Sequence, residues 1–346
     1  MTRILHSTLA VLLALAFPVA AQDPEDDALE EQRRQDERYH RRYAEAEPTP
    51  APDDAAREAL ARATELVRDA NHRALRTATV RLDTDDPRID LPAVARLLDA
   101  TDRLFDKVVA GRVEPAPDRE PAQLFLLWSY ADYNQLVGGS FGRSLVRPKG
   151  HYGTLFDAIV VHTDSDAPGA LGDTIVHEAA HRLVDRRLYA GSRVPATWLA
   201  EGLAEYFART RVSKDGQSEP GVVGGKAIAL FADGSGRSEA AESKARLNAL
   251  ARALREPEAP IAGPVMRADP AAFYGESVTE HYTVSWVLVH WLLHAEDPAR
   301  TRGFFEFLDL DRRGEGGPET FFRTVGIAES DLDAALRDHV ERMRVR

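Results

Sequence analysis

The chain of 346 residues contains no cysteine. This absence excludes disulfide bonds and thiolate ligands to a metal, so the folded state must depend on its hydrophobic core. It also excludes anchoring through a lipid-modified cysteine. Long hydrophobic runs are missing as well, because the apolar run at residues 9–17 (LAVLLALAF) is too short and too poorly flanked to span a bilayer.

Positive charge is comparatively scarce. The chain has 44 Lys and Arg against 56 Asp and Glu, which gives a formal net charge of −12. This balance argues against nucleic acid or an anionic membrane surface as the main partner. The content of 44% hydrophobic and 29% charged residues is ordinary for a globular protein, and the length fits one large domain or two small ones.

The first 21 residues have the pattern of a secretory signal peptide. Arg3 makes the start positive, residues 9–17 are apolar, and residues 19–21 (VAA) offer a small-residue cleavage site. We therefore expect an exported protein, periplasmic or extracellular, with no membrane span in its mature chain; a buried N-terminal helix is the alternative. Residues 22–54 are rich in charge and then in proline, and we expect them to form a disordered linker.

Beyond the linker, the spacing of apolar residues predicts helices and strands in alternation, and then mostly helices. This order indicates the α+β class with a small mixed sheet, in an N-terminal part at residues 55–211 and a helical C-terminal part at 212–346. Residues 212–241 are rich in Gly, Ser and charge and predict a loop. The expected strands are 78–83, 124–130 and 158–162, and the expected helices are 55–76, 91–109, 131–136, 174–184, 198–209, 242–255, 277–294, 298–308, 318–324 and 330–344, the last capped by Ser330.

Residues 174–184 (TIVHEAAHRLV) carry two histidines four positions apart. On a helix, His177 and His181 project from the same face, so both imidazoles can bind one Zn²⁺ at roughly 2.0–2.1 Å. Glu178 follows the first histidine and can act as the general base for an attacking water molecule. Such a site needs a third protein ligand and an open fourth position.

Glu201 is the candidate for the third ligand. It lies in a second apolar helix, residues 198–207 (WLAEGLAEYF), far enough after His181 for one helix to end and another to begin. Burying these polar groups without partners would cost roughly 2–7 kcal/mol each, and a metal would compensate that cost. A buried hydrogen-bonded cluster without a metal is the alternative.

Residues 177–181 (HEAAH) followed by 198–206 (WLAEGLAEY) resemble the gluzincin metallopeptidases. They are most similar to bacterial peptidase MA-like proteins, many of which are domains of unknown function. The resemblance implies a gluzincin-like zincin fold with a zinc-binding helix pair, His177, His181 and Glu201 as ligands of one Zn²⁺, and Glu178 as the catalytic base. Outside these two motifs the likeness is one of general pattern.

Neighbouring classes of zinc enzyme fit less well. The metzincin pattern requires a glycine and a third histidine shortly after the second, where this chain has Val184 and Arg187. A deformylase-type site requires a cysteine ligand, which the chain lacks.

The resemblance also implies how a substrate would bind. In gluzincins the strand before the zinc-binding helix is an exposed edge that pairs with the substrate backbone. Residues 156–162, with Ile159, Val160 and Val161, are the candidate for this strand. An interior strand is the alternative.

Peptide hydrolysis develops negative charge on the carbonyl oxygen, and gluzincins stabilise it with a Tyr or His donor. Tyr282 is the first candidate for this role, ahead of Tyr274 and His281. A tyrosine that packs against the zinc-binding helices is the alternative.

Two further carboxylates are candidates for support of the metal ligands. Glu205, four residues after Glu201, can accept a hydrogen bond from the free ring nitrogen of a zinc-bound histidine; a solvent-facing charge is the alternative. Asp185 is the weaker candidate, because the arginines that follow it can form a surface ion pair with it. His290 and His294 repeat the four-residue spacing without a neighbouring acid, and we expect no metal there.

The sequence therefore predicts an exported zinc-dependent peptidase that acts on a peptide or protein substrate. One alternative is a non-catalytic binding or scaffold protein that retains the zinc core, which a cleft closed by residues 212–241 or a fourth protein ligand would favour. Another is a zinc hydrolase of non-peptide bonds. The chain lacks a segment like the Gly-x-Met-Glu-Asn of the aminopeptidase N group, which disfavours an aminopeptidase.

Overall fold

A computed structural model describes residues 61, 64–65, 72–116, 120–140, 149–154, 156–164, 170–191, 193–255, 260–343 and 345. The signal peptide and the linker expected at residues 1–54 lie outside the described residues, so both stay predictions. Within the described ranges, no helix combines the length and the apolar character that crossing a membrane requires.

The N-terminal part contains a small mixed sheet, as the sequence predicts. Its five strands lie in the order β1-β2-β3-β5-β4. The three central strands are parallel, and each outer strand pairs antiparallel with its neighbour. The strands are β1 (Arg73–Arg76), β2 (Val80–Thr84), β3 (Ala122–Leu127), β4 (Gly150–Gly153) and β5 (Ala158–His162).

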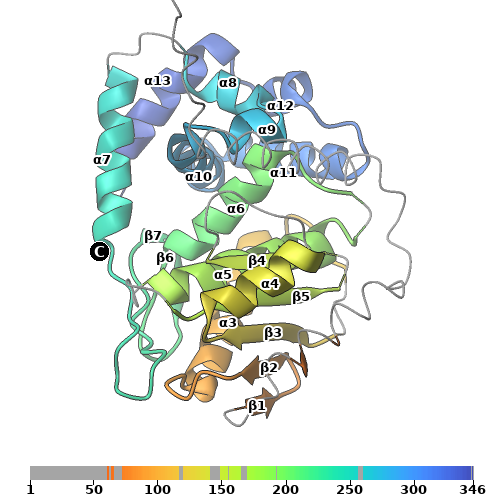
Figure 1. Ribbon diagram of the computed structural model, residues 1–346. Coiled ribbons are helices and arrows are strands. Elements are labelled where there is room, and N and C mark those ends of the chain that lie inside the picture. The colour runs from red at the N-terminus through yellow and green to blue at the C-terminus, as the bar shows by residue number, and fades with distance from the viewer. Residues whose placement is uncertain are drawn as a thin grey trace, which may run out of the picture.

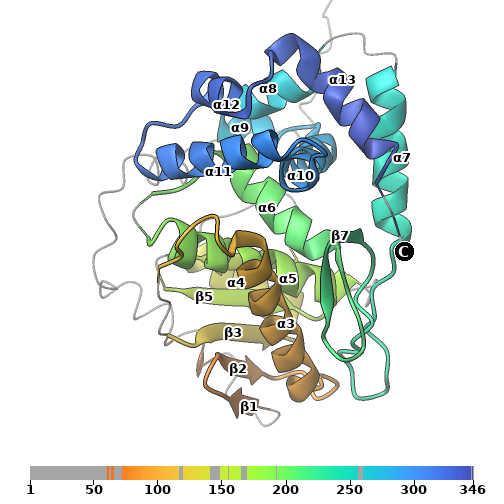
Figure 2. The ribbon, with the colours of Figure 1, turned by 180° about the vertical axis from the view of Figure 1, so that it is seen from behind.

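Helices cover both faces of this sheet (Figures 1 and 2). On one face lies α4 (Tyr130–Ser140), where Phe125, Leu127 and Val160 enter a small core with its side chains. On the other face lie α3 (Leu91–Val109) and α5 (Ala170–Leu183), and there the alternate strand residues join the main core. The alternation of side chains along each strand produces this division between the two faces.

The expectation of an exposed edge at residues 156–162 is wrong. Strand β5 is an interior strand, hydrogen-bonded to β3 on one side and to β4 on the other. Ile159, Val160 and Val161 are each at most 1% exposed, so they are core residues and offer no exposed edge to a substrate. The edge beside β5 is β4, a four-residue strand that the sequence reading missed.

The C-terminal part is mostly helical and shares the main core with the sheet. At its centre α10 packs on α6, and Gly202 of α6 permits a close approach: a Cβ at this position would lie 2.5 Å from the carbonyl oxygen of Ser285. The helices are α6 (Thr197–Arg209), α7 (Ala241–Arg255), α8 (Ala262–Arg267), α9 (Pro270–Phe273), α10 (Val278–His294), α11 (Pro298–Arg312), α12 (Pro318–Val325) and α13 (Glu329–Val340).

Three other local predictions are wrong. Residues 73–76, expected in a helix, form β1. The segment 212–241, expected as a loop, contains β7 (Ser218–Val223), which pairs with β6 (Thr210–Val212) at the end of α6. Helix α13 is preceded by Ala328 at its N-cap position, so Ser330 lies inside the helix and does not cap it.

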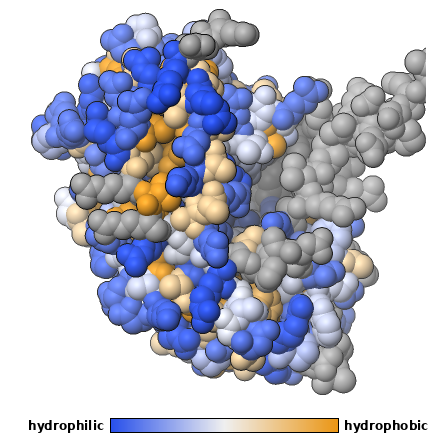
Figure 3. Space-filling view, turned by 90° about the vertical axis from the view of Figure 1, so that its left-hand side faces the viewer, coloured by the Kyte–Doolittle hydropathy of each residue, from blue (hydrophilic) through white to orange (hydrophobic). Residues whose placement is uncertain are grey.

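Helix α7 lies at the periphery of the helical part, with leucines at 247, 250 and 254 buried and its other face exposed. The face of the molecule that carries it is largely hydrophilic, interrupted by one apolar strip (Figure 3). Helix α7 therefore has the amphipathic pattern of a surface helix.

Candidate metal centre

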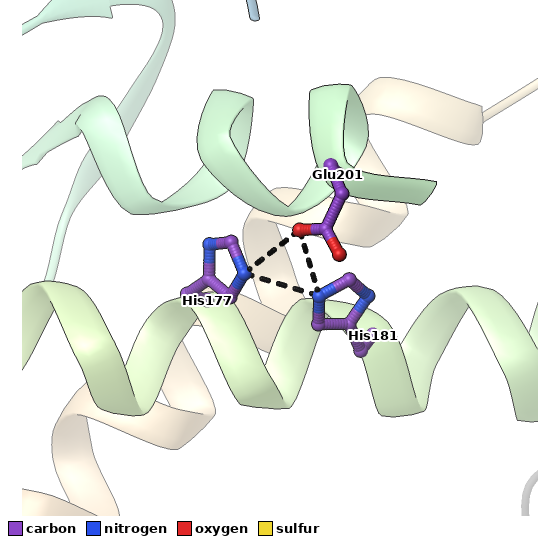
Figure 4. A group of neighbouring side chains, drawn as sticks. All are labelled: His177, His181 and Glu201. Carbon is purple, nitrogen blue, oxygen red and sulfur yellow. Dashed lines mark hydrogen bonds and ion pairs between the residues drawn. The ribbon is translucent and has the colours of Figure 1, made fainter. Parts of the chain in front are cut away.

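The candidate site lies between α5 and α6, which lie side by side (Figure 4). The two helices run antiparallel, because His181 faces Glu201 and the earlier His177 faces the later Glu205. Helix α5 presents His177 and His181 one turn apart on the face toward α6, and α6 presents Glu201 between the two imidazole rings. The four-residue spacing on α5 thus has the consequence expected from the sequence, because both rings reach the same point in space.

The three side chains form a nearly equilateral triangle of potential ligand atoms. The Nε2 atoms of His177 and His181 are 3.1 Å apart, and they lie 3.2 and 3.4 Å from Oε2 of Glu201. A tetrahedral zinc ion with bonds of about 2.05 Å places its ligand atoms about 3.3 Å apart. The triangle therefore has the dimensions that zinc requires.

Glu201 Oε2 gives a second reason to assign a cation to this point. The oxygen is buried and makes no hydrogen bond of good geometry, although Nε2 of each histidine lies within 3.4 Å of it. Oε1 of the same carboxylate accepts a hydrogen bond of 2.6 Å from the hydroxyl of Tyr274. A buried carboxylate oxygen without a well-placed hydrogen bond is costly, and a metal ion between it and the two imidazoles would satisfy it. The two nitrogens and one oxygen are a donor set that zinc accepts.

In the part of the chain that the structure describes, this is the one group of three His, Cys, Asp or Glu side chains close enough to hold an ion. It has three members, so no fourth ligand of these types joins it. The arrangement can bind a metal ion through three protein side chains, the number that catalytic zinc sites use.

The site attracts positive charge. Burial would lower the pKa of His177, but the carboxylates of Glu201 and Glu205, together with Glu178, raise it to about 10. Burial raises the pKa of Glu178, a trend that His177 and His181 oppose and Glu201 reinforces. A carboxyl group with a raised pKa beside a metal centre suits a general base, which works best when its pKa is near the operating pH.

Glu205 lies where the sequence predicts. Its Oε1 is 3.3 Å from Nδ1 of His177, so the carboxylate can hold that ring with Nε2 directed at the metal position. Asp185 does not lie there: it accepts a hydrogen bond of 2.8 Å from the hydroxyl of Tyr152 and contacts neither histidine. The expectation that Asp185 supports a metal ligand is therefore wrong.

The three candidates for the oxyanion donor have different contacts in the structure. The ring of Tyr282 lies 6.0 Å from that of His177, and its hydroxyl faces the Glu201 carboxylate. Burial, and then Glu201, raises the pKa of Tyr282 well above its ordinary value, so the hydroxyl keeps its proton and can donate it. Tyr274 donates a short hydrogen bond to Oε1 of Glu201, and His281 directs Nδ1 at the carbonyl oxygen of Phe273 at 2.6 Å.

The Tyr274 hydrogen bond leads to a prediction. Replacing Tyr274 with phenylalanine keeps the ring but releases Oε1 of Glu201, which frees the carboxylate to rotate. We expect the zinc dissociation constant to rise about 10–100-fold, as for other groups that orient metal ligands. Competition with a chelator measures this constant. In Tyr282→Phe, zinc affinity should fall less than in Tyr274→Phe while turnover falls more. Equal zinc affinity in Tyr274→Phe and the wild type would contradict the assignment.

His290 and His294 take part in a different, buried cluster. Nδ1 of His290 lies 2.8 Å from Nε2 of His339, and Nε2 of His290 lies 3.1 Å from the carbonyl oxygen of Gly221. His294 hydrogen-bonds to the hydroxyl of Tyr206 at 2.9 Å. These contacts join α10 to α13, β7 and α6, a role that the sequence reading did not include.

This histidine cluster predicts a loss of stability in acid. Burial lowers the pKa of His290 to about 3 and those of His294 and His339 to about 4, below the value near 6.5 of an unfolded chain. The unfolded chain therefore binds more protons, so stability is complete above pH 6.5 and is lost as the pH falls toward 4. Urea unfolding of the wild type and of His339→Gln between pH 4.5 and 7.5 checks this. The decrease in unfolding free energy over this pH range should be about 3 kcal/mol smaller in the variant than in the wild type. Parallel curves would refute it.

Contacts that sequence reasoning missed surround Glu178. A Cβ on Gly150 of β4 would lie 2.9 Å from Cγ of Glu178 and 2.8 Å from Cγ2 of Thr174, so the edge strand lies directly against α5 at the base. The backbone N–H of Tyr152 also interacts with the Glu178 carboxyl group and lowers its pKa. The glycines of β4 were the sequence signal that could have predicted this contact with α5, because a close approach of the backbone to another element favours glycine.

Comparison with known proteins adds a family without an assigned function. The sequence model of a family described as "Protein of unknown function (DUF1570)" matches residues 172–310. The match begins in α5 and ends in α11, so it includes the ligand triangle, Glu178 and both tyrosines. No curated protein matches the chain.

Proposed function

We propose that this protein is an exported zinc-dependent peptidase with a gluzincin-type site on a zincin-like fold. The observation that carries the proposal is the triangle of His177, His181 and Glu201, with the dimensions of a zinc site and Glu178 beside it. The resemblance of the two helix motifs to peptidase MA-like proteins supports the reaction class, and the pattern of the first 21 residues supports export.

The residues of the chain divide the chemistry among them. Zinc, when bound, would supply a Lewis acid that polarises a carbonyl group and acidifies water. Glu178 takes a proton from the water molecule as the oxygen attacks the scissile carbonyl, and then gives that proton to the leaving amine nitrogen. Tyr282 donates a hydrogen bond to the carbonyl oxygen as its negative charge develops.

Strand β4 replaces β5 as the substrate-binding edge in this proposal. It lies at the end of the sheet, and among the described residues no strand pairs with its outer side. An extended peptide can pair with such an edge through backbone hydrogen bonds. Because Gly150 and Tyr152 contact Glu178, a peptide on β4 would lie beside the base.

The proposal is tested by incubating the zinc-loaded mature protein with a peptide library and identifying products by mass spectrometry. We expect internal peptide bonds to be cleaved, and cleavage to stop when a chelator removes the zinc. Zinc binding without cleavage of any peptide would favour the binding-protein alternative, and hydrolysis of ester or amide substrates alone would favour a hydrolase of non-peptide bonds.

A further inference from the structure

Side chains of α5 and α6 meet in three successive pairs along the two helices. We call each pair a layer, and two of the three layers belong to the metal centre. Along α5 the residues Asp173, His177 and His181 recur every four positions, and along α6 Glu201, Glu205 and Arg209 do the same. Because the helices are antiparallel, His181 meets Glu201 at 3.4 Å, His177 meets Glu205 at 3.3 Å, and Asp173 meets Arg209 at 3.6 Å.

The third layer is connected directly to the second. Glu205 divides its carboxylate between two partners: Oε1 faces Nδ1 of His177, and Oε2 accepts a hydrogen bond of 2.9 Å from Nε of Arg209. Arg246 of α7 approaches the same Oε2 at 3.5 Å. The guanidinium of Arg209 therefore fixes the orientation in which Glu205 meets the histidine.

Asp173 is fixed in turn from the segment that follows β7. Its Oδ1 accepts a hydrogen bond of 2.9 Å from Ser238 and lies 3.4 Å from Nζ of Lys226. Lys226 is fully buried and also donates to the carbonyl oxygens of Ala208 and Thr210, at the end of α6. The third layer thus ties the start of α5 to the end of α6.

Stability alone is a weak explanation for so many buried charges. Apolar side chains of similar volume often hold two helices together as well as a buried ion pair does, or better. What an apolar pair cannot supply is a directional contact that holds the Glu205 carboxylate in one orientation.

We propose that Arg209 and Asp173 are positioning residues of the metal centre, which set the register of α5 against α6 and hold Glu205 against His177. The inference rests on the proposed metal site and adds to it a pair of residues that do not touch the ion. Loss of this layer should allow His177 to rotate and Glu201 to shift along α5, which weakens zinc binding.

The test compares Arg209→Met, Arg209→Lys and Asp173→Asn with the control Arg187→Met in the mature full chain. Arg187 is a suitable control because it is also largely buried and paired, with Asp102 at 3.0 Å and Asp106 at 2.7 Å, and both of these partners belong to α3. Three quantities are measured: the zinc dissociation constant by chelator competition, the visible absorption of the cobalt(II) form, and the thermal midpoint of the metal-free protein.

We expect Arg209→Met and Asp173→Asn to raise the zinc dissociation constant about 10–100-fold and to alter the cobalt spectrum. Arg209→Lys should have an intermediate effect, because lysine keeps the charge but lacks the planar fork of arginine. Adding Glu205→Gln to Arg209→Met should cause little further loss, since both act through the same contact. Arg187→Met should lower only the thermal midpoint.

If Arg209→Lys and Asp173→Asn fold, bind zinc as the wild type does and leave the cobalt spectrum unchanged, the layer is structural and the inference fails. These two milder variants decide the matter if Arg209→Met does not fold. A wild-type protein that binds no zinc would instead refute the proposed function, on which this inference rests.

Discussion

Replacing Glu178 with glutamine is expected to lower kcat by on the order of 10²–10⁴-fold while zinc remains bound. Glutamine has the same shape but cannot take a proton from water. Glu178 also lies outside the triangle of ligand atoms, so its replacement leaves the three ligands in place. The measurement is kcat on a cleaved peptide, together with the zinc content of the same preparation.

Glu319→Gln makes the same chemical change on α12, where the carboxylate pairs with Arg267 at 2.9 Å on the surface. This control should retain full activity and full zinc content. Undiminished turnover in Glu178→Gln would remove Glu178 from the mechanism, whereas loss of zinc in that variant would show that the residue acts on the metal site.

Replacing His181 with alanine is expected to abolish zinc binding and to reduce activity to that of the metal-free protein. A ligand that binds only the folded state stabilises it by about 2.7 kcal/mol at a hundredfold excess over its dissociation constant. The wild type should therefore gain about this much unfolding free energy at such a zinc concentration, and His181→Ala should gain none.

The same titration separates binding from catalysis, because Glu178→Gln should gain as much stability from zinc as the wild type. Chemical unfolding with and without zinc provides the numbers. Equal stabilisation of His181→Ala and the wild type would mean that the ion binds elsewhere, and would contradict the assigned ligands.

Features that depend on local spacing were predictable from the sequence. Helix α3 has the predicted bounds, because its amphipathic repeat follows a helix start at Asp90, whose side chain accepts a hydrogen bond from the backbone N–H of Ala93. The convergence of His177, His181 and Glu201 was also predictable, since four-residue spacing on one helix and a known motif on the next define it.

Features that depend on distant partners were not predictable. Strand β5 is a run of five buried residues, and such a run does not reveal whether strands pair on both of its sides. Its neighbour β4 has only four residues, two of them glycine, and carries no alternating pattern. Tyr274 meets Glu201 across 73 positions of sequence, because the short helix α9 brings it there.

The most direct test of the central claim is the metal content of the purified protein, measured by elemental analysis after dialysis against zinc and then against metal-free buffer. We predict one zinc ion per chain for the wild type and for Glu178→Gln, and none for the double variant His177→Ala/His181→Ala. A wild-type protein that retains no zinc, or a double variant that retains as much as the wild type, would contradict the account.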